Sequence, residues 1–212
     1  MGLASSKQSP KARSRTPERR RRRPADETRR EALASARKIL LKRGASAVTL
    51  KAIADNLGTT HTNLVHHFGS AAALQSELMS LMVRELAASL MDVVAHVRAD
   101  AAAPRTLVDM VFDATDKGGA GALAAWIAFS GNLRHLKPVR EAMAEVVAAI
   151  EEKFANESAE LLHLTVTSAV LFITLMAFGD SVIGRPLRDM LGRDNAASRK
   201  VAAFLLPKLF TP

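Results

Sequence analysis

A run of hydrogen-bonding side chains at residues 59–67 carries the most distinctive chemistry in this chain. The run reads TTHTNLVHH and contains no carboxylate. Hydroxyl, amide and imidazole groups of this kind contact the base edges and backbone phosphates of nucleic acids. We therefore expect a nucleic-acid contact surface made of its polar members, among them His61, Thr62, Asn63, His66 and His67.

Two short helices joined by a glycine must position these side chains. Apolar residues recur at helical spacing over residues 50–57 and stop at Gly58, whereas Leu64 and Phe68 give the following segment an inward face. A threonine, the kind of residue that often caps a helix, precedes each segment, at Thr49 and Thr60. Such a pair presents its second helix to the major groove of DNA, so the spacing predicts a helix-turn-helix.

The adjacent histidines also raise the alternative of a metal site. Neighbouring residues on a helix point about 100° apart, so His66 and His67 seldom bind one ion. No HExxH motif or carboxylate-rich cluster accompanies them, and the chain has no cysteine. The sequence also lacks the spacing of a nucleophile–base pair or a phosphate-binding loop. We therefore expect no metal, no cofactor and no enzymatic activity.

Positive charge is concentrated at the start of the chain. Residues 1–25 hold nine of the 30 lysines and arginines but one of the 21 acidic residues, so most of the net charge of +9 lies there. This segment is rich in Ser, Pro and Arg and poor in apolar residues, which predicts a disordered arm. The arm is either a solvated tail or a source of non-specific phosphate contacts.

The remaining sequence predicts an all-α protein, because Ala and Leu dominate and Tyr is absent. We expect a loop or short turn at Gly184, Pro186 and Gly192. Caps, breaks and apolar spacing predict about nine helices, at 26–43, 50–57, 60–67, 71–98, 104–115, 120–135, 138–156, 158–178 and 195–206. The domains expected are the arm at 1–25, a helix-turn-helix unit at 26–73 and a C-terminal helical bundle at 74–212.

The N-terminal pattern resembles that of the TetR family of bacterial transcriptional regulators. In that family a first helix ends at a Gly, and a Thr then starts a second helix that carries Ile-Ala. A Gly turn, a Leu-Tyr-x-His-Phe segment and a Ser-Lys-x-x-Leu segment follow. The match covers residues 26–74, roughly a quarter of the chain, and rests on Gly44, Thr49, Ile53, Ala54, Gly58, Thr60, Leu64, His67, Phe68, Ser70 and Leu74.

Two positions depart from the family pattern. Val65 stands where the family has Tyr, and Ala71 stands where it has Lys. Both differences remove a side chain that would reach a phosphate, although Val65 can contact a thymine methyl group. We therefore expect weaker anchoring on the DNA backbone than is usual, and we hypothesise that the Arg-rich arm compensates.

The resemblance implies binding to double-stranded DNA through the recognition helix and its surroundings. The DNA-contact positions that it implies are Thr49, Lys51, Thr59, Thr60, His61, Thr62, Asn63, Val65, His66 and His67. It also implies a homodimer on a palindromic operator, with the two recognition helices roughly 34–36 Å apart. The implied dimer interface lies on the last two long helices, at Leu161, Leu162, Val166, Val170, Ile173, Val201, Phe204 and Leu205.

A ligand cavity in the C-terminal bundle is a further implication of the resemblance. Apolar walls with a few polar groups would suit an apolar or aromatic small-molecule effector. The candidate lining residues are Met82, Met110, Phe112, Trp126, Phe129, Asn132, His135, His163, Phe172 and Met176. For each of them, packing in an ordinary core is the alternative.

These observations favour a ligand-responsive transcriptional repressor. The rivals are a protein that binds DNA non-specifically through its basic arm and a helical small-molecule-binding protein. The charge-free stretch at 161–179 contains His163 and several Thr, which indicates a buried interface helix rather than a membrane span. Pro24, Asp26 and Glu27 follow the arginine run where a signal peptide would turn apolar, so we expect a cytoplasmic protein.

Overall fold

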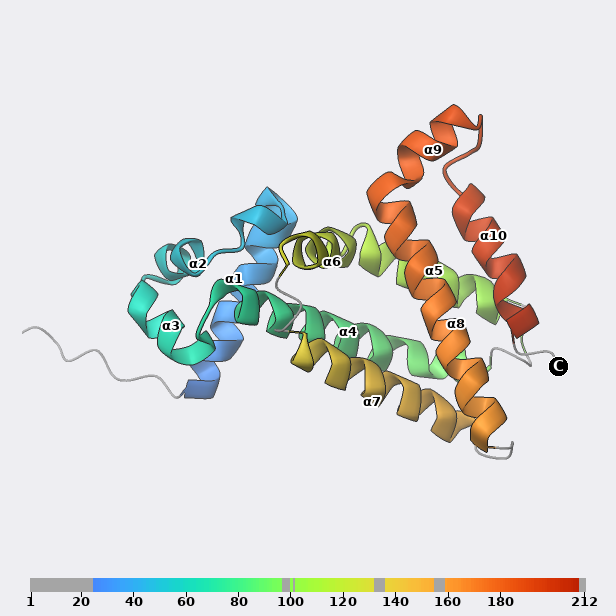
Figure 1. Ribbon diagram of the computed structural model, residues 1–212, viewed down its shortest axis with the longest axis horizontal. Helices are drawn as coiled ribbons and strands as arrows, with labels where there is room; N and C mark the ends of the chain where they lie inside the picture. The colour runs from blue at the N-terminus through green and yellow to red at the C-terminus, as the bar shows by residue number, and fades with distance from the viewer. Residues whose placement is uncertain (1–24, 97–99, 101, 132–135, 155–158, 210–212) are drawn as a thin grey trace, which may run out of the picture.

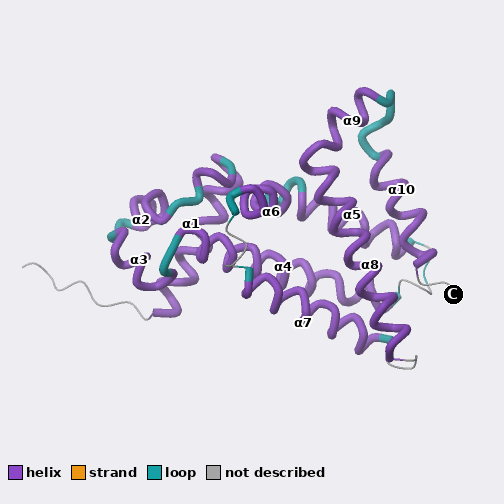
Figure 2. Tube along the Cα trace, in the orientation of Figure 1, coloured by secondary structure: helices purple, strands orange, loops and turns teal. Residues whose placement is uncertain are grey.

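The computed structural model describes residues 25–96, 100, 102–131, 136–154 and 159–209 (Figure 1). The arm predicted at 1–25 lies outside the described residues except for its last position. Every regular element in the described part of the chain is helical, which confirms the all-α class (Figure 2). The α-helices are α1 (Ala25–Arg43), α2 (Leu50–Leu57), α3 (His61–Phe68), α4 (Ala71–Ala95), α5 (Ala103–Thr115), α6 (Ala120–Phe129), α7 (Lys137–Lys153), α8 (Ala159–Gly179), α9 (Arg185–Met190) and α10 (Ala197–Leu205).

Helices α1, α2 and α3 pack around one apolar cluster at one end of the molecule (Figure 1). Asp26 at the first turn of α1 and Arg43 at its last turn complement the helix dipole. Ile53 of α2 and Leu64 of α3 are completely buried in this cluster. Burial of each such side chain contributes roughly 1.5–3 kcal/mol to stability. This free energy holds the two short helices with their apolar faces against the cluster.

Helix α4 connects this unit to the C-terminal bundle. Leu74 and Leu78 in its first half belong to the N-terminal cluster, whereas Leu90 and Val94 belong to a second cluster with α5, α7, α8 and α10. With 25 residues, α4 is about 37 Å long. It packs most extensively against α7, which runs alongside it in Figure 1. A single helix therefore enters both hydrophobic cores.

The helix predicted at 158–178 continues further than expected. After α8 the chain forms a π-helical turn, η3 (Asp180–Gly184), and then α9, so one apolar rod runs from Ala159 to Met190. The loop or short turn expected at Gly184 and Pro186 was wrong. Gly184 has helical backbone angles, and Pro186 lies in the first turn of α9, directly after the π-helical turn.

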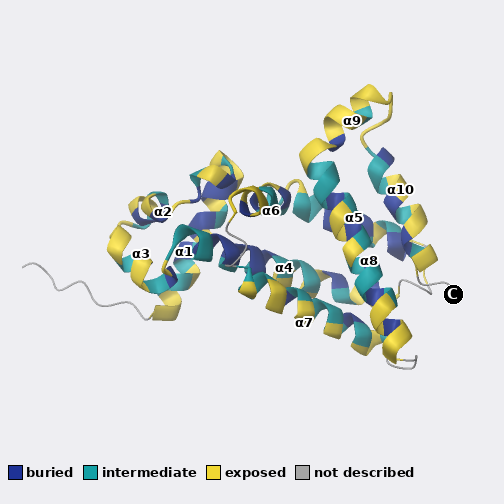
Figure 3. Cartoon of the chain, viewed as in Figure 1, coloured by how far each residue is buried: buried dark blue, intermediate teal, exposed yellow. Residues whose placement is uncertain are grey.

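The rod is long and apolar enough to match a membrane span by length and composition alone. In the structure, α8 packs against α5, α7 and α10 through one of its faces. Leu162, Val166 and Ile173 lie on that buried face, whereas Leu164 and Leu171 are exposed. Figure 3 shows that exposed residues continue over α9, which projects from the body. The rod is therefore a core helix on one side and an uncovered apolar surface on the other.

Candidate DNA-binding unit and apolar cavity

Side-chain caps and a left-handed glycine fix the geometry of the α2–α3 pair. The hydroxyl oxygen of Thr49 accepts from the N–H of Ala52 at 3.1 Å, and that of Thr60 accepts from the N–H of Asn63 at 3.1 Å. Gly58 ends α2 with φ 61° and ψ 36°, a conformation that costs a side-chain-bearing residue about 1–2 kcal/mol. The chain thus turns sharply into α3, as the spacing predicts for a helix-turn-helix.

The polar face of α3 is open to solvent. His61, Thr62, Val65 and His66 are exposed, and so are Thr49, Lys51 and Thr60 from the flanking positions. Thr59, Asn63 and His67 are half-buried. All ten predicted DNA-contact residues therefore lie at or next to the surface of the unit, whereas Leu64 and Phe68 point into its core.

Asn63 and His67 are partly engaged within the protein. The amide nitrogen of Asn63 donates to the hydroxyl oxygen of Thr59 at 3.2 Å, so a base would have to compete with this bond. The main-chain oxygen of His67 accepts from Arg29 of α1. The rings of His66 and His67 lie 5.7 Å apart in an edge-to-face arrangement. Among the described residues, no group of three or more side chains is placed to hold a metal ion.

Arg29 holds the end of α3 against α1 and α4. Besides His67, its guanidinium contacts the carboxylate of Glu77 on α4 and lies 4.8 Å from the centre of the Phe68 ring. Arg29 was not among the predicted site residues, because nothing in the local pattern links position 29 to a position 48 residues later. These contacts hold the end of α3 in place.

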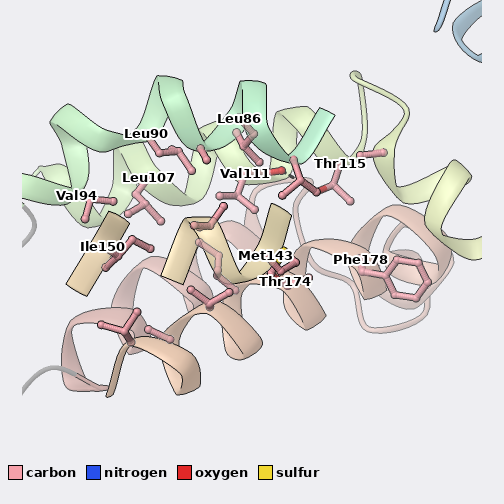
Figure 4. A pocket seen from close by; sticks show the side chains of 18 of the residues that line it. Leu86, Leu90, Val94, Leu107, Val111, Thr115, Met143, Ile150, Thr174 and Phe178 are labelled. Atoms are coloured by element: carbon pink, nitrogen blue, oxygen red, sulfur yellow. Dashed lines mark hydrogen bonds between the residues drawn. The ribbon is translucent and has the colours of Figure 1, made fainter. Parts of the chain in front are cut away.

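A cavity of about 200 Å³ lies in the C-terminal bundle (Figure 4). Its wall comes from α4, α5, α6, α7, α8 and the segment after α10. Met79, Leu86 and Leu90 of α4 line it on one side, and Val166 and Ile173 of α8 line it on another. Figure 4 shows Val94 and Phe178 at its two ends. Its wall is almost wholly apolar.

Residues 32–78 match the family model described as bacterial regulatory proteins, tetR family. This segment of the chain is similar to the TetR family. The matched segment contains the whole of the α2–α3 pair, which supports a transcriptional regulator with a helix-turn-helix DNA-binding unit.

A solved structure supports the same fold over most of the chain. It is described as a candidate TetR-family transcriptional regulator from Mesorhizobium loti MAFF303099 and superposes with a TM-score of 0.58. The alignment covers 89% of this chain and 98% of the other at 14% sequence identity, which shows a shared fold. No curated protein matched the sequence.

The cavity lies in the C-terminal bundle, as expected, but its wall is made of other residues than the candidates. Asn132 and His135 lie outside the described residues, and the structure places none of the other eight candidates on the cavity wall. Met82 and Phe112 are buried in the two cores, and Met110, Phe172 and Met176 are half-buried beside the second core. Trp126, Phe129 and His163 are exposed. The prediction favoured large aromatic residues, whereas most residues of the wall are aliphatic.

The residues that line the cavity do follow a pattern in the sequence, but it is less conspicuous than the aromatic residues. On α4 the lining residues recur at positions 79, 83, 86, 90 and 94, which is the spacing of one helical stripe. Leu74, Leu78 and Met82 form a neighbouring stripe that enters the N-terminal core. Two adjacent apolar stripes on one helix indicate two separate buried surfaces.

The predicted dimer residues divide between the interior and the surface. Leu162, Val166, Val170 and Ile173 face inward, and the last three line the cavity, so they are not at an outer surface. The reason is that α8 is apolar on nearly every side, so its sequence does not show which side is buried. Leu161, Val201, Phe204 and Leu205 are exposed. The exposed apolar side of α8 also includes Leu164, Leu171 and Leu175.

Proposed function

We propose that this protein is a ligand-responsive repressor of the TetR type, which binds a palindromic operator as a homodimer and is released by a small apolar effector. The observation that carries the proposal is that two helices contact both the DNA-binding unit and the cavity. Met79 and Val83 of α4 pack against the N-terminal core and also line the cavity. Ala120 and Ala124 of α6 do the same.

The recognition surface supports sequence-specific binding. Exposed His61 and Thr62, together with Asn63, would reach base edges in the major groove, where imidazole and amide groups can donate and accept hydrogen bonds. The N-terminus of α3, capped by Thr60, and the side chain of Lys51 would contact phosphates.

The uncovered side of the α8 and α10 helices supports a two-fold dimer. Leu171 and Leu175 of α8 are about 60% exposed, and Phe204 of α10 is 66% exposed. Such a continuous apolar surface usually marks an interface with another protein. A second copy on this side would place two recognition helices on one face of the duplex, as a palindromic operator requires.

Effector release would work by a population shift. A ligand that fits the cavity better when α4 and α6 have moved stabilises a spacing of the two recognition helices that the operator does not match. The long helix α4 is the lever, because its first half is packed into the DNA-binding unit and its second half lines the cavity. The protein would act in the cytoplasm, where its DNA lies.

The test is a selection of genomic fragments with the purified full-length protein at near-physiological salt. Enrichment of one palindrome, bound by a dimer, supports the proposal. Uniform binding that weakens steeply with salt would instead mean that the Arg-rich arm dominates. Ala substitution of Thr62 serves as the matched variant, because it should weaken binding to the palindrome and leave binding to random DNA unchanged.

A further inference from the structure

We propose that the cavity is built for an uncharged, mainly aliphatic chain, such as a medium-length alcohol, rather than for an aromatic or charged molecule. The inference rests on the proposed ligand-responsive function and names the chemical class of its effector. It follows from three properties of the cavity, which are the chemistry of its wall, the scarcity of ring systems on that wall and its shape.

The wall offers nothing to a charged group. Among the described residues that line the cavity, Thr115 and Thr174 carry the only polar side chains. The hydroxyl of Thr115 donates to the main-chain oxygen of Val111 at 2.7 Å, so its proton is already engaged. A carboxylate or ammonium inside would lose its hydration without gaining a partner. The wall therefore selects against ions of either sign.

Aromatic ligands also lack partners along most of the wall. Phe178 is the one aromatic side chain among the described lining residues, and Figure 4 shows it at one end. A ring in the remaining space would gain no offset or edge-to-face stacking. Met79, Met91 and Met143 add flexible thioethers, which adapt to chains of different length and bend. Branched and flexible aliphatic groups thus form the surface that a ligand meets.

The cavity extends along two helices. Its wall follows α4 from Met79 to Val94, about 22 Å at the rise of an α-helix, and follows α8 from Val166 to Phe178, about 18 Å. A volume of about 200 Å³ is only moderately larger than the roughly 150 Å³ of a compact cavity that holds benzene. Because this volume is distributed along two long helices, an extended chain fits it better than a bulky ring system.

Thr174 gives the chain a direction. This residue lines the cavity and is also exposed, so it marks an opening to solvent on α8. The polar end group of a ligand would lie there, hydrogen-bonded to the Thr174 hydroxyl or to water. Its alkyl chain would then be buried between α4 and α8.

The experiment is a calorimetric titration of the full-length protein with 1-alkanols from 1-hexanol to 1-decanol. Each added methylene group should raise affinity about fourfold until the chain fills the cavity. Octanoate has the same chain length as 1-octanol but a charged end group, which would lose part of its hydration even at the Thr174 opening, so it should bind more weakly than 1-octanol. The aromatic comparator, 2-naphthol, should also bind more weakly than 1-octanol.

Neighbouring alanines on α4 provide a matched pair of variants. Ala87 lines the cavity and Ala88 is exposed, so the same substitution tests the inside and the outside of one helix. With Ala87→Phe, affinity should stop rising at a shorter chain, whereas Ala88→Phe should behave as the unchanged protein does. If Ala87→Phe does not fold, Ala124→Leu fills the cavity from α6 instead.

Three results would overturn the inference. They are an affinity that does not depend on chain length, tighter binding of octanoate or 2-naphthol than of 1-octanol, and equal effects of Ala87→Phe and Ala88→Phe. Displacement of the selected palindromic DNA is measured in parallel. If 2-naphthol binds best and releases DNA, the aliphatic inference fails while ligand response stands. If the alkanols bind as expected but DNA affinity does not change, the ligand class stands and ligand response fails.

Discussion

Arg29 on α1 forms an ion pair with Glu77 on α4, and the same guanidinium donates to the last turn of α3. One side chain therefore ties the recognition helix to both the helix that starts the DNA-binding unit and the helix that leads to the cavity. The pair is only partly exposed, so it is screened less than a surface pair.

Replacing Arg29 should loosen the recognition helix. Arg29→Met is expected to lower the free energy of unfolding by about 1–2 kcal/mol and to weaken operator binding, because both the ion pair and the bond to His67 are lost. Arg30→Met is the control, since Arg30 is exposed and the substitution removes the same charge. Urea unfolding and fluorescence anisotropy measure the two effects. Equal losses in both variants would mean that the lost positive charge alone, and not the contacts of Arg29, explains the effect.

Lys51 should contribute a phosphate contact and no sequence preference. Lys51→Ala is expected to weaken binding to all DNA sequences alike and to reduce the slope of log affinity against log salt by about one. Lys153→Ala, at the far end of α7, removes a charge away from the DNA-binding unit and should leave the slope nearly unchanged (Figure 1). A changed base preference in Lys51→Ala would contradict the assignment.

The uncovered side of α8 and α10 should hold the dimer together. The double substitution Leu171→Glu and Phe204→Glu is expected to give monomers, because a dimer interface does not tolerate buried charges without a partner. Analytical ultracentrifugation measures the oligomeric state. Loss of the dimer should lower affinity for a palindrome at least about 100-fold. Phe129→Glu is the control, since Phe129 is 83% exposed but lies on α6. A double variant that remains dimeric would place the interface elsewhere.

Gly121 allows α6 to pack closely against its neighbours. A Cβ atom at this position would lie 2.8 Å from the Cβ of Ser181 and 2.9 Å from the Cγ2 of Thr115. Gly121→Ala should therefore destabilise the protein by about 1–3 kcal/mol, although alanine is the better helix former. Gly179→Ala meets no atom within 4 Å and should be neutral or stabilise by up to about 1 kcal/mol. Thermal unfolding of the two variants gives the comparison. A stabilised Gly121→Ala would mean that α6 can move away from Ser181 and Thr115 at little cost.

Arg199 of α10 joins two carboxylates of α5, at 2.7 Å to Asp113 and 3.3 Å to Asp109. Its hydrogen bond holds the pKa of Asp113 below the usual 3.8, although partial burial opposes this. The carboxylate therefore stabilises the folded state above about pH 4, and this contribution is lost as the pH falls through 3.8 toward the lowered pKa.

Arg199→Met should cost about 1 kcal/mol of unfolding free energy near pH 7, since Asp113 is 44% exposed and solvent screens the pair. The difference from the unchanged protein should narrow as the pH is lowered to 3, because the carboxylates become protonated. Lys200→Met removes a fully surface pair with Asp194 and should have little effect at either pH. Urea unfolding across this range is the measurement. A difference that stays constant with pH would assign the cost to lost packing on Phe112, which lies 5.4 Å from the Arg199 guanidinium.

The sequence by itself determined the DNA-binding unit, because short-range chemistry specifies it. Thr49 and Thr60 cap their helices through bonds to residues three positions on, and Gly58 adopts its left-handed turn without help from distant parts of the chain. The apolar spacing of α2 and α3 then leaves one polar face outside. Each of these interactions joins residues that are close in the sequence, so it can be predicted from the local sequence.

The tertiary structure alone decided which apolar residues enclose the cavity and which remain uncovered. Because α8 is apolar on nearly every side, only its packing against α5, α7 and α10 assigns Val166 to the wall and Leu171 to the surface. The contact of Arg29 with Glu77 spans 48 residues and depends on how α1 crosses α4. Local chemistry fixes a helix and its caps, whereas the direction in which each apolar side chain points depends on contacts between segments that are far apart in the sequence.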